Sequence, residues 1–558
     1  MKRVLCLSLL VLALPALARS PYREVAGFGY VSNTGVGRSL YVVGNHADIG
    51  SWNPAQSVRL YFTAGNVWTG GVAVQSGTAL EYKFISRDDG SGTHCDSNNA
   101  QWMDGANLVT QVPAQADAPY AGKTLLYHSG FTNVVLLYAS AGGAFTSVPM
   151  TRIGQGRSTN EWLYRADGFG EAGESLQFVP WDGGTNYDHA PYSGYGGGDY
   201  YTTLDAIFLQ DGDVFNYWPP SIVSASRIAE TNVGSSYAAI PGRRIRIYTP
   251  RGYDQNTWKS YPVLYMHDGN NIFSTNCDVC SWQANTTADK EISQGRMREC
   301  IIVGVDNSPN RLAEYGPPGD NIAGTNGIGD QYANFLVHNV RPTIDFHYRT
   351  LNDVDNTMTL GSSLGGLIST YLGLQTNIFG KIGPMSPSYW TGPKLVGWID
   401  SNATLGLRIY MDWGTGESSM WDQGWNVYGL FLKDGYAVNR DIVQVVGCGD
   451  LHNEAAWAGR LPGAFQFLLD PWDEANRLAH ELHPADLTNL ISTATGQVAT
   501  VRFEGLRGIT YVLEQSTNLA GEAWLGVATA SPVSRPWANI QVSVSNGMPS
   551  AVYRISGQ

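Results

Sequence analysis

Residues 356–375 read NTMTLGSSLGGLISTYLGLQ, and this stretch decides the fold of the central part of the chain. Its start is typical of a buried strand, and LGGLISTYLGLQ (364–375) has the apolar spacing of a helix. Between them, Gly361, Ser363 and Gly365 form the G-x-S-x-G pattern of a nucleophile elbow, a tight strand-to-helix turn that exposes a serine hydroxyl. Glycines let the turn close without a Cβ clash. The alternative is a small serine in a glycine-rich turn, so the hypothesis that Ser363 is a nucleophile needs partners elsewhere.

The segments on either side of this turn alternate between strand-like and helix-like runs. The strand-like runs are at 243–250, 261–269, 300–307, 357–363, 407–414 and 441–449, and the helix-like runs are at 330–348, 364–375 and 455–472. Alternation of this kind is typical of a parallel sheet covered by helices. Residues 221–480 are therefore predicted to be an α/β domain with a mostly parallel sheet and helices on both faces.

The remaining segments predict a multidomain chain in which β-sandwich modules flank the α/β domain. Short β runs alternate with Gly, Asn and Asp turns over residues 19–117, 122–219 and 486–558. Residues 1–18 read as a signal peptide, with two basic residues, an apolar core and a final Ala-Leu-Ala. We therefore expect secretion, extracellular or periplasmic. No other segment is apolar enough to span a bilayer, so no membrane span is expected.

Composition excludes one class of partner. The formal net charge of the 558 residues is −13, with no basic run, and nucleic-acid binding needs clustered Lys and Arg. Charged residues are only 15%, whereas Trp (17) and Tyr (30) are abundant. This mix indicates β-rich secreted domains with aromatic surfaces.

The cysteines remaining after residue 18 are odd in number. They are Cys95, Cys277, Cys280, Cys300 and Cys448. The CxxC spacing of Cys277 and Cys280 fits a local disulfide better than zinc in an exported chain. A Cys300–Cys448 pair is a further possibility, although sequence alone leaves the pairing open.

A serine nucleophile needs a base and an acid that orients the base. His452 follows a strand-like run and precedes a helix, which is the position that the base takes in α/β-hydrolases. The acid should follow the preceding strand, where Glu417 lies in a loop and Asp412 at the strand end. Glu417 is favoured because a loop carboxylate can reach the imidazole, and Asp412 is the alternative.

The oxyanion of the reaction needs backbone donors. The N–H of Leu364, directly after the nucleophile, is one candidate, and the N–H of Asn270, in the loop after an earlier strand, is the other. His267 precedes the serine and follows the wrong strand, so it is not expected to be the base. No metal or cofactor is required for this chemistry.

Five motifs in order resemble one esterase family. They are PVLYMHDGNNIF (262–273), EYGPPGD followed by GDQYANFLVHNVRPTIDFHYRT (314–350), TLGSSLGGLIS (359–369), YMDWGTGE (410–417) and HNEAAWAGRLPGAFQFLL (452–469). Together they are similar to esterase D and carbohydrate esterase family 1 enzymes, a family with feruloyl, acetylxylan and enterochelin esterases. The resemblance implies Ser363 as nucleophile, His452 as base and Glu417 as acid.

The first module resembles a family 20 starch-binding domain. YVVGNHADIGSWNP (41–54), EYKFI (81–85) and WMDGANLV (102–109) carry the likeness. It implies a sugar site formed by Trp52, Trp102 and Lys83 with Asn107 alongside, because indole rings stack on sugars and a lysine donates to hydroxyls. An insertion, DDGSGTHCDSNN, precedes Trp102. The alternative is that both tryptophans belong to the core.

The other two β modules give weaker resemblances. The stretch 176–201 is similar to family 25-type starch-binding sandwiches, which makes Trp181 a candidate sugar contact. The pattern beginning GLRGITYVLEQSTNLAGEAW (505–524) resembles a small C-terminal β-sandwich common on exported bacterial proteins.

Together these patterns predict a secreted serine esterase. It would hydrolyse acetyl or feruloyl-type esters while its N-terminal modules hold a polysaccharide such as starch or another α-glucan. The alternatives are a hydrolase of small esters such as siderophores, and a glucan-binding protein with an inactive hydrolase domain.

Overall fold

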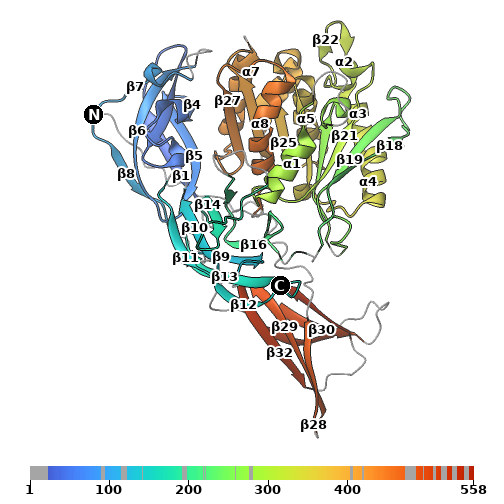
Figure 1. Cartoon of the computed structure of the whole chain (residues 1–558). Helices are drawn as coiled ribbons and strands as arrows, with labels where there is room; N and C mark the ends of the chain where they lie inside the picture. The colour runs from blue at the N-terminus through green and yellow to red at the C-terminus, as the bar shows by residue number, and fades with distance from the viewer. Residues whose placement is uncertain are drawn as a thin grey trace.

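The computed structural model describes residues 23–89, 95–114, 122–140, 143–191, 198–217, 219, 222–257, 259–274, 281–402, 406–417 and 420–471, together with the backbone of six strands beyond residue 485. Two β modules lie against one helix-rich domain in Figure 1. The predicted signal peptide at 1–18 and the Cys277–Cys280 motif lie outside the described residues. No helix of the described part is long and apolar enough to cross a membrane.

An eight-stranded sheet organises the helix-rich domain (Figure 1). In sheet order its strands are β18 (Arg227–Val233), β19 (Arg243–Thr249), β21 (Ile301–Val305), β20 (Val263–His267), β24 (Thr357–Ser362), β25 (Lys381–Met385), β26 (Arg408–Gly414) and β27 (Ile442–Gly447). The strands from β21 to β27 pair in parallel, as predicted. The sheet as a whole is mixed, because β18 and β19 pair antiparallel at one edge.

Two of these strands were absent from the prediction. β18 reads RIAETNV and is mostly exposed or half-buried, so it lacks the apolar run of a central strand. β25 reads KIGPM and contains Gly and Pro, which are depleted in strands. Both strands are held by their neighbours in the sheet rather than by a strong local preference.

Helices cover both faces of the sheet. They are α1 (Ala284–Ser293), α2 (Arg311–Glu314), α3 (Gly329–Phe335), the π-helix η5 (Leu336–Val340), α4 (Arg341–His347), α5 (Leu364–Gln375), α6 (Pro393–Ser401), α7 (Met420–Lys433) and α8 (Glu454–Leu468). Short 3₁₀ helices include η4 (Gly269–Asn271), η6 (Val354–Asn356) and η7 (Tyr389–Thr391), and β22 (Asn321–Ile322) pairs with β23 (Thr325–Asn326). The predicted helices at 330–348, 364–375 and 455–472 correspond to α3–α4, α5 and α8.

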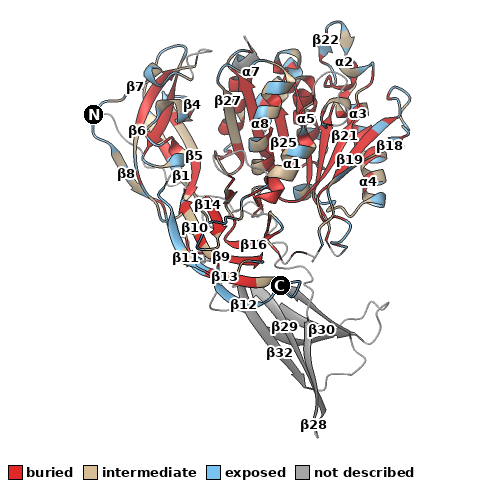
Figure 2. Ribbon diagram, viewed as in Figure 1, coloured by how far each residue is buried: buried red, intermediate tan, exposed pale blue. Residues whose placement is uncertain are grey.

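The alternating side chains of β20 explain why helices must cover both faces of the sheet. Val263 and Tyr265 pack in the apolar cluster that contains α5, whereas Leu264 and Met266 pack in the cluster that contains α1 and α8. Successive side chains of a strand point to opposite faces, so a strand that is apolar throughout buries both. The interior of this domain is accordingly buried on both sides of the sheet (Figure 2).

The first module contains two antiparallel sheets. One has the order β1 (Arg23–Val31), β5 (Val67–Gln75), β4 (Tyr61–Thr63), and the other joins β3 (Val58–Arg59), β2 (Arg38–Gly44), β6 (Ala79–Asp88), β7 (Gln101–Trp102) and β8 (Leu108–Gln111). The 3₁₀ helices η1 (Ala47–Ile49), η2 (Pro54–Gln56) and η3 (Ser97–Asn99) lie in its loops. Its core continues into that of the helix-rich domain, because the two share one apolar cluster.

The second module also contains two sheets. One has the order β11 (Thr146–Pro149), β10 (Val135–Ser140), β14 (Leu176–Trp181), β15 (Tyr200–Thr202), and the other β12 (Thr151–Gln155), β13 (Trp162–Phe169), β9 (Lys123–Ser129), β16 (Ala206–Gln210), β17 (Asp213–Phe215). Beyond residue 485, two three-stranded antiparallel sheets form, β28 (Asp486–Thr493) with β29 (Gly496–Leu506) and β32 (Trp537–Ser545), and β31 (Leu525–Ala530) with β30 (Tyr511–Ser516) and β33 (Val552–Gly557).

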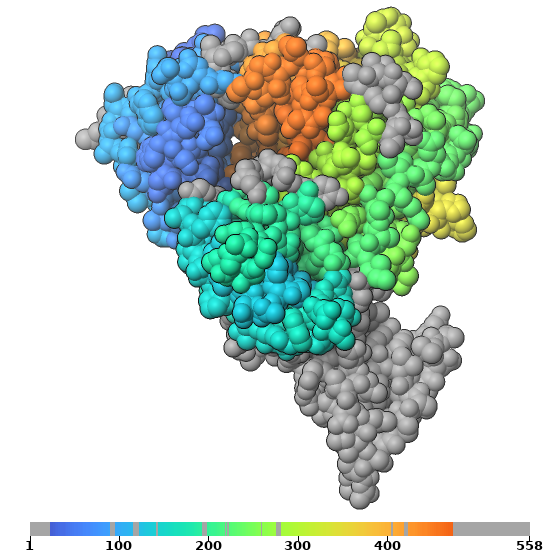
Figure 3. Space-filling model, in the orientation of Figure 1, coloured from blue at the N-terminus to red at the C-terminus, as the bar shows by residue number. Residues whose placement is uncertain are grey.

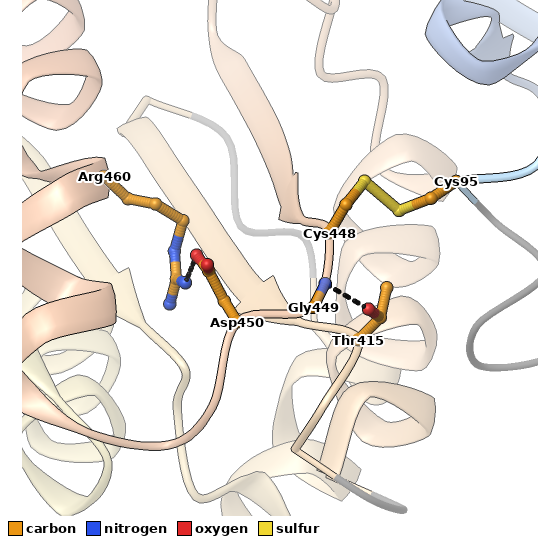
Figure 4. Close-up of a disulfide and its surroundings, with 6 residues drawn as sticks. All are labelled: Cys95, Thr415, Cys448, Gly449, Asp450 and Arg460. Carbon is orange, nitrogen blue, oxygen red and sulfur yellow. Dashed lines mark hydrogen bonds and ion pairs between the residues drawn. A yellow bond between two sulfur atoms is a disulfide. The ribbon is translucent and has the colours of Figure 1, made fainter.

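A disulfide joins Cys95 of the first module to Cys448 of the helix-rich domain (Figure 4). The pairing of Cys300 with Cys448 was therefore wrong. Cys300 precedes the first residue of β21, whereas Cys448 follows the last residue of β27, and these strands run in the same direction in one sheet. The two residues lie at opposite ends of strands that are five positions apart, about 24 Å across the sheet.

A buried ion pair of the helix-rich domain is hydrogen-bonded to the second module. Lys259 Nζ lies 2.5 Å from Glu299 Oε2, and their side chains are 0% and 6% exposed. Tyr217 of the second module donates its hydroxyl to Glu299 Oε1 at 2.9 Å. Both carboxylate oxygens are therefore satisfied, as a buried charge requires.

We expect Lys259→Met to lower the free energy of unfolding by about 3–5 kcal/mol, because it removes the positive charge 2.5 Å from the buried Glu299 carboxylate. Chemical denaturation followed by tyrosine and tryptophan fluorescence measures this. The matched control is Lys433→Met, which removes a surface pair with Asp400 and should change stability little. Equal stability losses in the two variants would contradict the assignment.

Candidate active site and sugar-binding surfaces

Ser363 lies on a strained turn between β24 and α5. Its φ is 57° and its ψ is −121°, a conformation that non-glycine residues rarely adopt and that marks functional strain. Gly361 and Gly365 make the turn possible, because a Cβ on Gly361 would lie 2.8 Å from the carbonyl carbon of Gly365. The structure thus places the G-x-S-x-G motif on the predicted strand-to-helix turn.

The loops after five neighbouring parallel strands meet at one edge of the sheet. Asn270 follows β20, Ser363 follows β24, Ser388 follows β25, Glu417 follows β26 and His452 follows β27. The carboxyl ends of parallel strands share an edge, which is where open α/β sheets form their sites.

His452 and Glu417 form a pair at this edge. His452 Nδ1 lies 3.3 Å from Glu417 Oε2, and the Glu417 side chain is fully buried. The other Glu417 oxygen accepts hydrogen bonds from Ser386 Oγ at 2.6 Å and from the Gly414 N–H at 3.0 Å. Because a carboxylate accepts, Nδ1 of the histidine is the donor, and Nε2 is left as the acceptor that a general base needs.

Two tryptophan rings lie near the imidazole. The buried Trp457 ring lies 5.0 Å from the His452 ring at an interplanar angle of 87°, and the Trp390 ring lies 6.4 Å away at an angle of 68°. Trp390 is 41% exposed. The imidazole is therefore held in place from one side, and an aromatic surface beside it is open to solvent.

Ser388 connects the nucleophile to this group. Ser363 Oγ lies 3.1 Å from Ser388 Oγ, and the Ser388 N–H donates to the Ser363 carbonyl at 3.0 Å. Among the described contacts, Ser363 Oγ is hydrogen-bonded to Ser388 and not to His452. The segment from Ser388 to Trp390 therefore contacts Ser363 at one end and lies near the His452 ring at the other.

Asp412, the alternative acid, lies elsewhere. It is fully buried and pairs with Arg460 of α8, whose Nε lies 3.1 Å from Asp412 Oδ2. Burial raises the pKa of Asp412, and the Arg460 charge opposes that rise. The structure therefore brings Glu417, and not Asp412, to the imidazole.

Leu364 directly follows Ser363, and the segment before Asn270 lies near the start of α5. Leu364 is the first residue of α5, and the first N–H groups of a helix have no intrahelical acceptor. The start of α5 contacts the loop after β20, because a Cβ on Gly365 would lie 3.4 Å from His267 Cβ and 3.5 Å from Asp268 Oδ2. Asn270 belongs to that loop.

Ser388, Trp390 and Arg460 were missed by the sequence analysis. Ser388 and Trp390 follow β25, which was not predicted as a strand. Had β25 been predicted, the loop after it would have been a candidate for the site, because the loops after neighbouring parallel strands share one edge. Arg460 lies among apolar residues of α8, and its position about one turn after Trp457, on the same buried face, is a local signal.

The first module brings its predicted sugar-binding residues to one surface. The Trp52 and Trp102 rings lie 6.4 Å apart and are tilted by 37°, and Trp102 is 46% exposed. Lys83 Nζ donates to the Gly105 carbonyl at 2.8 Å, and Asn107 Nδ2 donates to Glu81 Oε1 at 2.8 Å. Lys83 and Asn107 therefore brace the loop that follows Trp102.

Trp181 of the second module stacks within a row of rings. It lies 5.9 Å from Tyr187 at an angle of 12°, and Tyr187 lies 5.7 Å from His189 at 23°. Asp182 Oδ1 accepts N–H groups of Gly184 and Asn186, which closes the loop. Tyr187 and His189 were not predicted as sugar contacts, although both lie within residues 176–201.

Comparisons with known proteins agree with these two kinds of site. Residues 241–465 match the family model described as "Putative esterase", and residues 26–121 match the "Starch binding domain" model. The chain contains an esterase-family domain and a starch-binding domain.

Individual relatives cover only parts of the chain. YbbA, an uncharacterised protein of Bacillus subtilis (strain 168), is 29% identical over 154 residues, which are 26% of this chain and 58% of that protein. An α-amylase of Streptomyces violaceus is 38% identical over 89 residues, which are 16% of this chain and 14% of the amylase. The chain thus spans just over half of the first relative and a small part of the second.

Solved structures give a distant likeness. A ferulic acid esterase is 18% identical with a TM-score of 0.36, covering 45% of this chain and 99% of that one. The ferric enterobactin esterase of Salmonella typhimurium is 16% identical with a TM-score of 0.37, covering 82% of this chain and 96% of that one.

His267 is a buried, neutral histidine that is hydrogen-bonded at both ring nitrogens. Its Nδ1 lies 2.9 Å from the Tyr332 hydroxyl and its Nε2 lies 3.0 Å from Thr359 Oγ1. Burial lowers the pKa of His267 to about 3, with Asp268 opposing and Arg311 reinforcing the shift. It therefore stays neutral near neutral pH, and both of its ring nitrogens hold the end of β20 in place.

We expect His267 to make the protein less stable as pH falls from about 6.5 towards 3, because the unfolded chain binds a proton there that the folded chain does not. At pH 5 this amounts to about 2 kcal/mol. Urea unfolding of wild type and His267→Gln at pH 7 and pH 5 tests it: the variant should lose less stability on acidification. His347→Gln, at an exposed histidine, should behave like wild type.

Proposed function

We propose that the chain is a carbohydrate-bound serine ester hydrolase of the α/β-hydrolase type. The observation that carries the proposal is the buried Glu417 carboxylate at His452 Nδ1, at the same sheet edge as Ser363 on its strained turn. The match of residues 241–465 to an esterase family supports the reaction class.

The proposed reaction is a two-step acyl transfer to water. Ser363 Oγ attacks the ester carbonyl while His452 Nε2 takes its proton, and Glu417 stabilises the imidazolium. The Leu364 and Asn270 N–H groups hold the oxyanion. The alcohol leaves with the proton from His452, and water, deprotonated by His452, then cleaves the acyl-enzyme. The Ser363–Ser388 hydrogen bond must give way to one with His452 as substrate enters.

The two tryptophans of the first module are the proposed glucan contacts. An exposed indole offers a flat apolar face to a sugar ring, and a second ring 6.4 Å away extends that face. The match of residues 26–121 to a starch-binding family supports an α-glucan as the partner. Trp181 and its stacked neighbours are a second proposed sugar contact.

The proposed location is outside the cytoplasm. The Cys95–Cys448 disulfide supports it, because such bonds persist in oxidising compartments. The signal-peptide pattern at residues 1–18 points the same way.

Hydrolysis of nitrophenyl acetate tests the catalytic assignment. Ser363→Ala should lower kcat at least about a thousandfold, and Glu417→Gln about a hundredfold or more, because the imidazole loses its orienting charge. Asp412→Asn should reduce kcat less than tenfold, since Asp412 contacts Arg460 rather than His452. Ser401→Ala on the surface of α6 is the control. Wild-type rates in Ser363→Ala, or the reverse order of the two acid variants, would refute the assignment.

Retention on insoluble starch tests the binding surface. The double variant Trp52→Ala/Trp102→Ala should weaken binding by about tenfold or more, because both stacking faces are lost. The matched control is Phe62→Ala, another ring with 46% exposure in the same module but on the other sheet. Undiminished retention of the double variant would place the glucan elsewhere.

A further inference from the structure

The disulfide lies between the proposed glucan surface and the proposed catalytic histidine. Cys95 precedes η3 and β7, and β7 carries Trp102. Cys448 directly follows β27 and is four residues before His452. The bridge therefore joins the loop that leads to the sugar-binding ring with the loop that leads to the base.

The loop after Cys448 is fixed to the catalytic acid's surroundings (Figure 4). The Gly449 N–H donates to Thr415 Oγ1 at 2.8 Å, in the same loop as Glu417. The Asp450 carboxylate accepts from Arg460, and Arg460 Nη2 lies 3.6 Å from Glu417 Oε1. A module held by Cys448 is therefore held relative to His452 itself.

A second contact holds the starch-binding domain along β5. The Val438 N–H donates to the Gly71 carbonyl at 2.9 Å, and the Ala73 N–H donates to the Val438 carbonyl at 2.8 Å. This backbone pairing precedes β27, whereas the disulfide follows it. The two domains are thus joined at both ends of β27.

Between these two attachments the domains are separated by a polar cavity of about 550 Å³. Figure 3 shows a gap between the domains on the face drawn. Its walls include Asp48, Asn53, Gln56, Arg59, Asn439 and Gln444, with both half-cystines at its border. Trp425 and Tyr428 of the helix-rich domain also line it, and the Arg59 guanidinium lies 5.3 Å from the centre of the Trp425 ring. The disulfide adds a covalent link to these contacts.

The connection limits how far the two sites lie apart. The residues from Trp102 to Cys95 and from Cys448 to His452, with the 6.0 Å between the half-cystine Cα atoms, span at most about 45 Å at full extension. One polysaccharide chain can cover this span. A glucan on Trp52 and Trp102 is then present at the catalytic edge at a high effective concentration.

We propose that the substrate is an O-acyl ester carried by the same α-glucan chain that the starch-binding domain holds. The Cys95–Cys448 bridge then sets the distance between the sugar-binding surface and the sheet edge that carries His452. The inference rests on the proposed function. The ester C–O bond breaks, the acyl group passes through Ser363 Oγ to water, and the glucan hydroxyl keeps the proton given by His452. The products are a carboxylic acid and the deacylated glucan.

The test compares acetylated starch, acetylated xylan of equal ester content and nitrophenyl acetate. Wild type should deacetylate the starch with kcat/KM about tenfold or more above the xylan, because only the starch gains from the binding surface. Equal kcat/KM on the two polymers would overturn the substrate assignment. Absence of activity on nitrophenyl acetate would instead refute the proposed function.

The double variant Cys95→Ser/Cys448→Ser tests the bridge. It should keep the nitrophenyl acetate rate within about twofold and its retention on starch, yet lose about fivefold or more in kcat/KM on acetylated starch. Cys300→Ala, which leaves the bridge intact, is the matched control and should match wild type on all three measures. Full activity of the double variant on acetylated starch, or an equal loss on the small ester, would overturn the role of the bridge.

Discussion

Parallel pairing in one direction is the constraint on which the site depends. β20, β24, β25, β26 and β27 lie side by side and run the same way, so the loops after them leave the sheet at one edge. Residues as distant in sequence as Asn271 and Glu454 are thereby brought together, and Asn271 Nδ2 donates to Glu454 Oε1 at 3.0 Å. Apolar side chains on both faces of the strands, covered by α5 and α8, fix that arrangement.

Local sequence patterns predicted the turn that carries Ser363 and the loop that carries His452. The glycines around Ser363 predicted the strand-to-helix turn, because a tight turn of this kind needs residues without a Cβ. The predicted strand before His452 indicated that His452 lies beside the acid. The sequence favoured Glu417 over Asp412 because a loop carboxylate can reach the imidazole, but it left Asp412 as an alternative. Burial separates them: Asp412 faces Arg460, and Glu417 reaches the imidazole. The Cys95–Cys448 bond spans 353 residues, a pairing that depends on how domains pack.

The proposed sugar-binding residues fall into two groups that the sequence did not distinguish. Lys83 and Asn107 use their donors within the module, on Gly105 and Glu81, so they shape the loop after Trp102. The exposed Trp102 ring and the half-buried Trp52 ring are left to offer flat surfaces. The proposed catalytic edge is similar, because buried Trp457 lies against His452 while Trp390 is 41% exposed.

The position of the starch-binding domain beside β27 has a consequence for solubility. β27 is the last strand of its sheet, and a bare terminal strand presents unpaired N–H and C=O groups on which another molecule can add a strand. The domain lies across this side, paired at Val438 and bonded at Cys448. It therefore shields the sheet from self-association, so detaching it would expose an aggregation-prone border as well as remove a sugar-binding surface.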